Sequence, residues 1–243
     1  MKSMVMVLLT MLLMVVSGAH AGTILIDFGA DTLTTTGAGD TWNNVSSGRL
    51  EASPDTNLNS LGGSGDLLYA DGTDSGYTFS AEALGNTKIG GSAVDFTGTL
   101  PVNPTGTLYP SSAYADSMFT GNTSESTYTV TLANLNIDFV YDLTFLSAFN
   151  GGNDNGDAVW TITQGFGDVL SITNDIATSN DAGFVQLTGI SPTQDGVIEI
   201  LLTSTPEGKN GRWNTLEITE VPEPATIALL GLGAVFFRRR KNA

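Results

Sequence analysis

The side chains that most often carry enzymatic chemistry are scarce in this sequence. The chain has 243 residues, no cysteine and one histidine. That histidine, His20, lies in a segment that we expect to be removed, which excludes a Ser-His-Asp triad, a Cys-His dyad and a zinc site from the mature protein. A paired-carboxylate glycosidase and a Ca²⁺-assisted lyase remain, the lyase with Lys88, Lys209, Arg212 or a tyrosine as base by elimination. Because neither has a recognisable motif here, we predict that the protein is not an enzyme.

Calcium binding is the chemistry that the sequence favours most. Residues 150–157 contain three Asn and two Asp among glycines, and Ca²⁺ takes oxygen ligands from such loops. The candidate ligands are Asn150, Asn153, Asp154, Asn155 and Asp157. The same residue types also build plain polar turns, and the spacing lacks the bidentate glutamate of an EF-hand. Residues 71–76 could likewise form a Ca²⁺ site or a plain polar turn. Ca²⁺ is therefore a candidate ligand, and no cofactor is certain.

Two tryptophans are candidates for a sugar-binding surface. Trp160 alternates with Ala158 and Ile162, so we expect it in the core. In a regular strand Trp213 lies opposite Leu216 and therefore points away from the core. Trp42 lies in a loop-rich region. We therefore take Trp213 and Trp42 as candidate carbohydrate-binding residues, the alternative being that each covers an edge of the core.

Residues 1–21 have the composition of a secretory signal peptide. Lys2 supplies positive charge, residues 5–16 are almost wholly apolar, and Ala19 and Ala21 form an A-x-A cleavage site. A membrane helix is the alternative, but the run is shorter than the roughly 20 residues that span a bilayer. We predict a signal helix that signal peptidase removes by cleaving after Ala21.

The C-terminal segment, residues 221–243, has three consecutive features. They are the motif Pro222, Glu223 and Pro224, an apolar stretch over 225–237, and a basic cluster over 238–241 that contains Arg238, Arg239 and Arg240. The apolar stretch makes about 20 Å of helix, which is short against the roughly 30 Å hydrocarbon core. The basic cluster should stay cytoplasmic. We predict a short transmembrane helix that anchors the protein transiently in the inner membrane.

This order and spacing resemble the PEP-CTERM sorting signal of bacterial exported proteins. The resemblance implies an exosortase partner, which cleaves near the motif, and delivery to the cell surface or an extracellular matrix. An ordinary tail anchor is the alternative. The resemblance covers only the C-terminal segment and gives no information about residues 22–220.

Residues 22–220 are predicted to form an all-β domain. Apolar residues recur with a period of two, between clusters of Gly, Asn, Asp and Pro. Examples are Ile24, Ile26 and Phe28; Tyr77, Phe79 and Ala81; Tyr128, Val130 and Leu132; Tyr141, Leu143 and Phe145; and Ile198, Ile200 and Leu202. Residues 29–66 are loop-rich. Eight or more short strands with one apolar face predict an antiparallel two-sheet β-sandwich, flanked by the signal helix and the short C-terminal transmembrane helix.

The strand pattern resembles the jelly-roll domains of galactose-binding-like, carbohydrate-binding proteins. The resemblance rests on an opening strand over 24–29, a strand over 128–132 followed by one over 141–145 that runs antiparallel to it, and a closing strand over 213–218. It implies a jelly roll and an extracellular polysaccharide as partner. Many functions share this sandwich, so the implication for fold is stronger than that for sugar binding.

The net charge of the chain excludes some classes of binding partner. The whole chain has a net charge of -16, with 25 acidic and nine basic residues. All acidic residues except Glu223 lie within 22–220, with only four of the basic ones. Such a domain is a poor partner for nucleic acid or an anionic membrane. Three hypotheses remain: a structural or adhesive surface protein of biofilm or exopolysaccharide, which we favour, a carbohydrate-binding module, and a glycan-active enzyme.

Overall fold

Strands make up most of the part of the chain that the computed structural model describes. The described residues are 21–29, 40–45, 66–84, 100–107, 109–115, 117–120, 126–149, 156–165, 167–175, 181–205 and 209–222. The elements are β1 (Thr23–Phe28), β2 (Trp42–Val45), β3 (Asp66–Leu68), β4 (Asp74–Leu84), the 3₁₀ helix η1 (Ser111–Tyr114), β5 (Met118–Phe119), β6 (Thr127–Ala133), β7 (Phe139–Phe149), β8 (Asp157–Gln164), β9 (Asp168–Asn174), β10 (Asp181–Ile190), β11 (Ile198–Thr205), β12 (Arg212–Trp213) and β13 (Thr215–Pro222).

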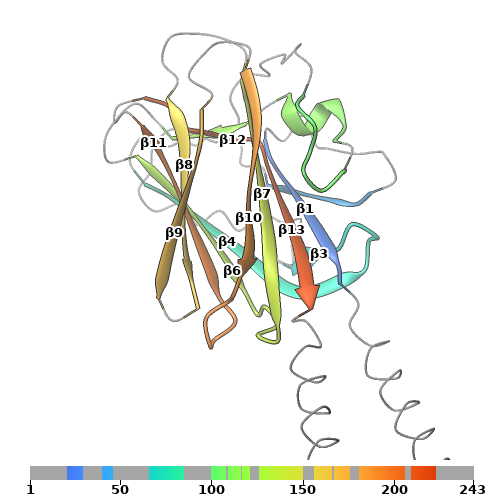
Figure 1. Cartoon of the computed structure of the whole chain (residues 1–243). Helices are drawn as coiled ribbons and strands as arrows, with labels where there is room; N and C mark the ends of the chain where they lie inside the picture. Colours follow the sequence, from blue (N-terminus) through green and yellow to red (C-terminus); the bar gives the residue numbers. More distant parts are fainter. Residues whose placement is uncertain are drawn as a thin grey trace, which may run out of the picture.

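Two sheets pack face to face (Figure 1). One has five strands in the order β10-β7-β13-β1-β2, and the other has six in the order β3-β4-β6-β11-β8-β9. A two-stranded sheet, β12-β5, completes the described structure. Every pairing is antiparallel except that of β1 with β2, which is parallel. The all-β, two-sheet jelly-roll prediction is confirmed.

The chain crosses repeatedly between the two sheets. β6 pairs with β4 and β11, whereas β7 pairs with β10 and β13. The consecutive strands that the sequence predicts over 128–132 and 141–145 therefore belong to different sheets and do not pair with each other. The turn after β6 instead carries the chain to the opposite sheet, so that the apolar faces of both strands meet across the core.

The first and last strands of the described fold lie side by side. β1 pairs antiparallel with β13, with Ile24 opposite Ile218 and Ile26 opposite Leu216. The start of β1 and the end of β13 reach the same end of the sandwich (Figure 1). The predicted opening and closing strands are thus neighbours, and Gly22 and Glu220 lie next to each other at this end of the sandwich.

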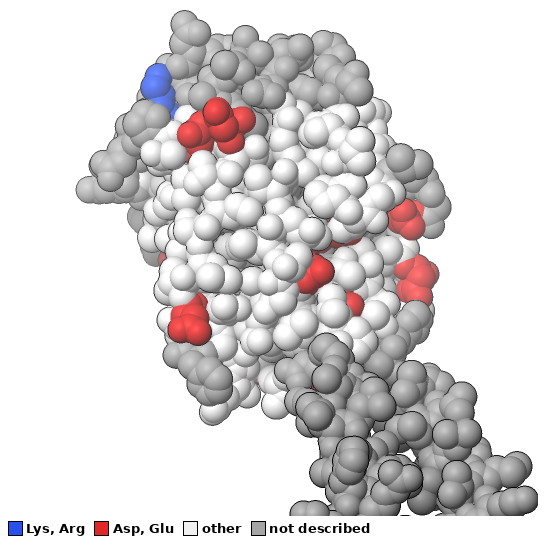
Figure 2. Space-filling view, in the orientation of Figure 1, with Lys and Arg blue, Asp and Glu red and all other residues white. Residues whose placement is uncertain are grey.

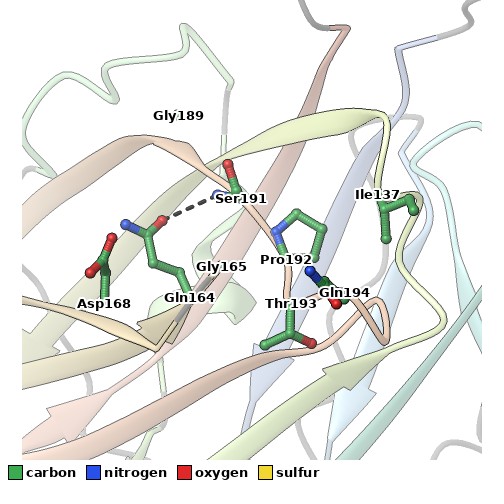
Figure 3. A pocket seen from close by; sticks show the side chains of 9 residues that line it. All are labelled: Ile137, Gln164, Gly165, Asp168, Gly189, Ser191, Pro192, Thr193 and Gln194. Carbon is green, nitrogen blue, oxygen red and sulfur yellow. Dashed lines mark hydrogen bonds between the residues drawn. The ribbon is translucent and has the colours of Figure 1, made fainter.

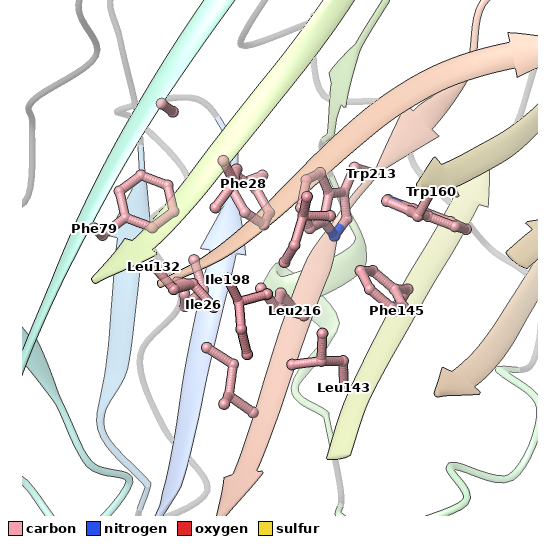
Figure 4. Packing of buried hydrophobic residues seen from close by; sticks show 14 of the residues in the cluster. Ile26, Phe28, Phe79, Leu132, Leu143, Phe145, Trp160, Ile198, Trp213 and Leu216 are labelled. Carbon is pink, nitrogen blue, oxygen red and sulfur yellow. The ribbon is translucent and has the colours of Figure 1, made fainter. Parts of the chain in front are cut away.

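The core lies between the sheets and consists mainly of the alternating apolar residues that the sequence singles out. In β6 the odd-numbered threonines are half-buried, whereas Tyr128, Val130 and Leu132 are fully buried. Figure 4 shows Phe28, Phe145, Trp160 and Trp213 packed together within this layer. The period of two therefore identifies the inner face correctly, because successive side chains of a strand point to opposite sides.

The outer faces of the two sheets differ. Residues Leu100, Tyr109 and Tyr114, on the segment that contains η1, pack against Leu146 and Ala148 on the outside of the five-stranded sheet. The outside of the six-stranded sheet instead presents half-buried and exposed polar side chains. They include Ser80, Thr129, Thr131, Thr161, Thr163 and Ser171, which lie in register across β4, β6, β8 and β9 through β11.

The predicted signal helix and C-terminal transmembrane helix lie outside the described residues. Within the described ranges, no helix is both long and apolar enough to cross a bilayer.

Candidate functional site

Trp213 lies in the core, which corrects the prediction that it points outward. Its exposed fraction is 0 %, and its ring centroid lies 4.4 Å from that of Phe28 and 5.7 Å from that of Phe145. The indole nitrogen donates a hydrogen bond to the Thr215 carbonyl oxygen at 2.9 Å. The alternation of inward and outward side chains is interrupted at Asn214, which separates β12 from β13. As at a β-bulge, the residues before and after this break no longer follow one alternating pattern. Trp213 therefore offers no exposed surface to a sugar.

Trp42 is also buried, with an exposed fraction of 7 %. It belongs to a small cluster with Leu25 and Ala113, and its ring meets that of Tyr109 edge-on at 5.2 Å between centroids. The expectation of an exposed aromatic platform is thus wrong for both tryptophans. Trp160, by contrast, is in the core as predicted.

The predicted calcium loop is described only at its end. Asn150, Asn153, Asp154 and Asn155 lie outside the described residues. Asp157 begins β8, and its pKa is raised by burial and by the neighbouring carboxylate of Asp175. Two carboxylates thus lie close together beside the predicted loop. Among the residues whose structure is described, no group of three or more acidic or histidine side chains converges as metal ligands do. The hypothesis that this loop binds Ca²⁺ stays a prediction.

The second acidic loop is a β-turn between β3 and β4. The Asp71 carboxylate accepts hydrogen bonds from the Thr73 backbone at 2.9 Å and from the Thr73 hydroxyl at 2.6 Å, and the Asp74 carboxylate accepts one from the Gly76 backbone at 2.9 Å. These side chains terminate the turn, which is the usual role of aspartate in such loops.

Arg212 has a structural environment rather than a catalytic one. Its guanidinium lies between the rings of Phe149, at 3.4 Å, and Phe119, at 4.8 Å, and donates a hydrogen bond to the Ser117 hydroxyl at 3.1 Å. Burial lowers the pKa of Arg212 to about 9. The side chain is 7 % exposed, so substrate has little access to it. Lys88 lies outside the described residues.

A pocket with both polar and apolar lining opens at the end of the sandwich where β8 turns into β9. We call it the end pocket. It has a volume of about 360 Å³ and is lined by Ile137, Gln164, Gly165, Asp168, Gly189, Ser191, Pro192, Thr193 and Gln194. In Figure 3, Gln164 and Asp168 lie on one side of it and Ile137 on the other. The turn after β6, the β8–β9 turn and the segment between β10 and β11 thus meet at one place.

Hydrogen bonds fix the walls of the end pocket. The Gln164 side-chain oxygen accepts a bond from the Ser191 backbone at 3.1 Å (Figure 3), and the Gly165 backbone donates to the Ser191 carbonyl oxygen at 2.9 Å. Gly165 has a φ of 46°, in the left-handed region that glycine adopts readily. The β8–β9 turn is therefore tied to the segment after β10, and the pocket is formed before any ligand arrives.

The end pocket is mostly neutral. Its polar groups are the amides of Gln164 and Gln194, the hydroxyls of Ser191 and Thr193, and one carboxylate, that of Asp168. On the face in Figure 2, acidic side chains likewise form separate small groups, with basic charge (blue) at the upper left, and the other described residues of that face are uncharged. Such a pocket suits a ligand with hydroxyl groups better than a strongly charged one.

The sorting motif is described only at its beginning. Pro222 is the last residue of β13, while Glu223, Pro224, Arg238, Arg239 and Arg240 lie outside the described residues. At the other end Ala21 is the first described residue, and Ala19 lies outside.

Comparison with known proteins identifies the C-terminal segment. The family model of the PEP-CTERM protein-sorting motif matches residues 220–241. The chain therefore carries a PEP-CTERM sorting motif, which directs export and membrane-associated processing by exosortase, followed by localisation at the surface. No curated protein matches the sequence.

Solved β-sandwich structures resemble this chain at low sequence identity. The extracellular domain of ANXUR2 from Arabidopsis thaliana is 14 % identical, with a TM-score of 0.46 over 84 % of this chain and 49 % of that one. The match thus spans about half of the plant protein. Carbohydrate-binding modules of family 35 from Cellvibrio japonicus Abf62 and Clostridium thermocellum are 16 % and 15 % identical, with TM-scores of 0.33 and 0.30. These matches cover 51 % and 43 % of this chain, and 83 % and 79 % of the two modules.

The sequence reasoning missed the end pocket and two buried glutamates. Glu217 and Glu220 are 1 % and 2 % exposed on β13. Charged residues are rarely buried without partners, so two glutamates in a closing strand that also contains Leu216, Ile218 and Val221 were a usable signal. The end pocket had no such signal, because three turns far apart in the sequence form it.

Proposed function

We propose that this protein is an exosortase-processed protein of the cell surface or extracellular matrix, whose non-catalytic β-sandwich binds an extracellular polysaccharide at the end pocket. Export and processing follow from the PEP-CTERM motif. The observation that carries the binding proposal is the end pocket itself, a preformed hollow of about 360 Å³ with amide, hydroxyl and carboxylate groups around an apolar edge.

A sugar ring requires two kinds of contact. Its hydroxyls need donors and acceptors, which Gln164, Thr193 and Gln194 provide, and its C–H face needs an apolar surface, which the exposed Ile137 provides. The pocket volume lies at the low end of the roughly 300–1,000 Å³ that is usual for ligand sites. Because hydrogen bonds already hold the walls in place, binding costs little ordering of the protein.

The pocket chemistry favours binding over catalysis. A glycosidase needs two carboxyl groups, about 5–9.5 Å apart, on either side of the scissile bond. Among the described residues that line the end pocket, Asp168 is the one carboxylate. We therefore propose a binding module that holds the glycan and leaves it intact.

Binding can be tested with the exported protein purified from its host. A glycan array and retention in gels that contain the host's extracellular polysaccharide identify the ligand. We expect the Asp168→Asn and Gln194→Ala variants to lose retention, because both exposed side chains line the pocket. Asp195→Asn is the matched control, since Asp195 is exposed on the same segment but does not line the pocket. Equal retention of all variants would count against the proposed site.

A structural or adhesive role without a specific sugar site is the second candidate. The observation in its favour is the outer face of the six-stranded sheet, where threonine and serine side chains of β4, β6, β8 and β9 lie in rows that pass through Glu199 and Leu201 of β11. Such a face could lie flat against a matrix. If it does, replacing Thr161 and Thr163 with lysine should weaken adhesion to host biofilm, whereas Asp168→Asn should leave adhesion unchanged.

We also propose Ca²⁺ as a ligand of residues 150–157. The support is the proximity of the Asp157 and Asp175 carboxylates: burial and the neighbouring Asp175 together raise the pKa of Asp157. A divalent cation bound between the two carboxylates would remove their repulsion.

A further inference from the structure

Glu220 is a buried carboxylate whose partners include the predicted mature N-terminus. It is 2 % exposed. One carboxylate oxygen, Oε1, accepts hydrogen bonds from the hydroxyls of Tyr69, at 2.9 Å, and Tyr77. The other, Oε2, accepts a hydrogen bond from the backbone nitrogen of Gly22 at 2.8 Å. A carboxylate removed from water in this way is costly unless a positive charge accompanies it.

Basic side chains do not supply that charge within the described residues. Lys209 and Arg212 are the basic residues there. Arg212, on β12, lies between the rings of Phe119 and Phe149, and the side chains that donate hydrogen bonds to the Glu220 carboxylate are those of Tyr69 and Tyr77. The donors found are two phenols and one backbone amide, all neutral while Gly22 follows Ala21 in an intact peptide bond.

Gly22 is held firmly against Glu220. The Glu220 backbone nitrogen donates to the Gly22 carbonyl oxygen at 3.0 Å, and the next residue along, Thr23, pairs with Thr219. The ring of Tyr69 covers Gly22 so closely that a Cβ atom there would lie 2.2 Å from Tyr69 Cε1. Position 22 thus requires glycine, and its nitrogen cannot move away from the carboxylate without disrupting the end of β1.

We propose that Glu220, with Tyr69 and Tyr77, forms a binding site for the α-ammonium group that signal-peptide cleavage creates at Gly22. Hydrolysis adds water across the Ala21–Gly22 bond: the C–N bond breaks, Ala21 leaves as a carboxylate, and the Gly22 nitrogen leaves as –NH₃⁺. The hydrogen bond from a neutral N–H to the Glu220 carboxylate becomes an ion pair between –NH₃⁺ and that carboxylate, in which both partners are charged and which is stronger. Processing at the N-terminus thereby locks β1 to the end of β13, next to the sorting motif.

The inference rests on the proposed export and on cleavage after Ala21, but not on polysaccharide binding. The titratable groups that face the Gly22 nitrogen or its carboxylate are Glu220 from β13, Tyr69 from the turn after β3, Tyr77 from β4 and, behind Tyr77, Tyr141 from β7. A single carboxylate within hydrogen-bond distance should raise the pKa of an α-amine, ordinarily about 7.7–8.0, by about one unit or more.

The test is the titration of the Gly22 α-amine in the exported protein. Its rate of reaction with an acylating reagent, followed by mass spectrometry of the N-terminal peptide, gives its pKa. The same peptide shows where cleavage occurred, so a start other than Gly22 would overturn the inference and leave the binding proposal standing. We expect the wild-type pKa to lie about one unit above the ordinary range. A wild-type value within the ordinary range would contradict the inference without need of any variant.

Two variants of β13 give a matched comparison. Glu220→Gln should return the pKa of the α-amine to its ordinary range. Glu217→Gln should not, because Glu217 is equally buried but bonds to Tyr109, Thr107 and Asn103 instead. Acetylation of Gly22 should lower the unfolding midpoint of the wild type and of Glu217→Gln but not of Glu220→Gln. An equal loss in all three proteins would overturn the inference.

Discussion

Replacing Trp213 with alanine tests the packing of the core. Four aromatic rings surround its indole: those of Phe28, Phe145, Trp160 and Tyr128, with centroids 4.4, 5.7, 6.1 and 6.2 Å away. The side chain is fully buried. Truncation would leave a cavity between the two sheets and remove the hydrogen bond to the Thr215 carbonyl. Large aromatic-to-alanine changes in cores cost about 3–5 kcal/mol.

The assay is urea unfolding followed by far-UV circular dichroism, which does not depend on tryptophan emission. At about 2–4 °C per kcal/mol, the Trp213→Ala substitution should also lower the unfolding temperature by roughly 6–20 °C. Trp42→Ala is the comparison, since Trp42 belongs to the smaller cluster, and we expect a smaller loss. If Trp213→Ala unfolds within about 0.5 kcal/mol of the wild type, as an exposed site would, the packing described for Trp213 is wrong.

Three further outcomes follow from the structure. Burial raises the pKa values of Tyr69 and Tyr141 from 10.0 to about 12, so the folded state holds their protons longer than the unfolded state does. The contribution of these two tyrosines to stability should be constant below pH 10 and be lost between pH 10 and 12. Ionisation of these two tyrosines without unfolding would contradict this. Burial and the neighbouring Asp175 raise the pKa of Asp157, so without Ca²⁺ the stability of the protein should fall as the pH rises through the carboxylate range. Ca²⁺ should raise the melting midpoint of the wild type but not that of Asp157→Asn. A calorimetric titration with Ca²⁺ that releases no heat would contradict the calcium proposal. Gly196→Ala should lower the free energy of unfolding by at least about 1 kcal/mol, because Gly196 has a φ of 71° and a Cβ there would lie 2.6 Å from the Leu135 carbonyl oxygen. Gly167 has a φ of 92° but open space around it, so Gly167→Ala should lower the free energy of unfolding less in the same urea titration.

The inner faces of the strands were predictable because their pattern is local. Tyr141, Leu143 and Phe145 alternate in the sequence and are fully buried in the structure. Strand pairing was not predictable in the same way. Nothing in the sequences of β6 and β7 indicates that the turn between them crosses to the other sheet. Likewise, nothing in the sequences of β1 and β2 indicates that these two strands pair in parallel.

The position of Trp213 could not be read from alternation, because the period of two holds only while a strand is regular. Asn214 receives a hydrogen bond from the Ala148 backbone at 2.7 Å and donates one to the Leu146 carbonyl oxygen at 3.0 Å. These bonds hold the chain at the break between β12 and β13, where the phase changes. The break depends on a partner strand more than 60 residues away along the chain.

The candidate site was less predictable than the fold. Ile137, Gln164 and Gln194 come from three separate turns, and only the crossing of the chain between the sheets brings them together. Their residue types are ordinary for turns, so no single segment marks them as functional. The sorting motif was predictable in full, since its proline, apolar and basic parts are consecutive in the sequence and need no fold to be recognised.

The most direct test of the central proposal is calorimetric titration of an oligosaccharide from the host's extracellular polysaccharide into the exported protein. Loss of neutral hydrogen bonds costs about 0.5–1.5 kcal/mol each, and 1.4 kcal/mol is about tenfold in affinity. The double variant Asp168→Asn and Gln194→Ala should therefore bind roughly tenfold more weakly, while Asp195→Asn should bind as the wild type does. Wild-type affinity in the double variant would contradict the proposal that the end pocket binds polysaccharide.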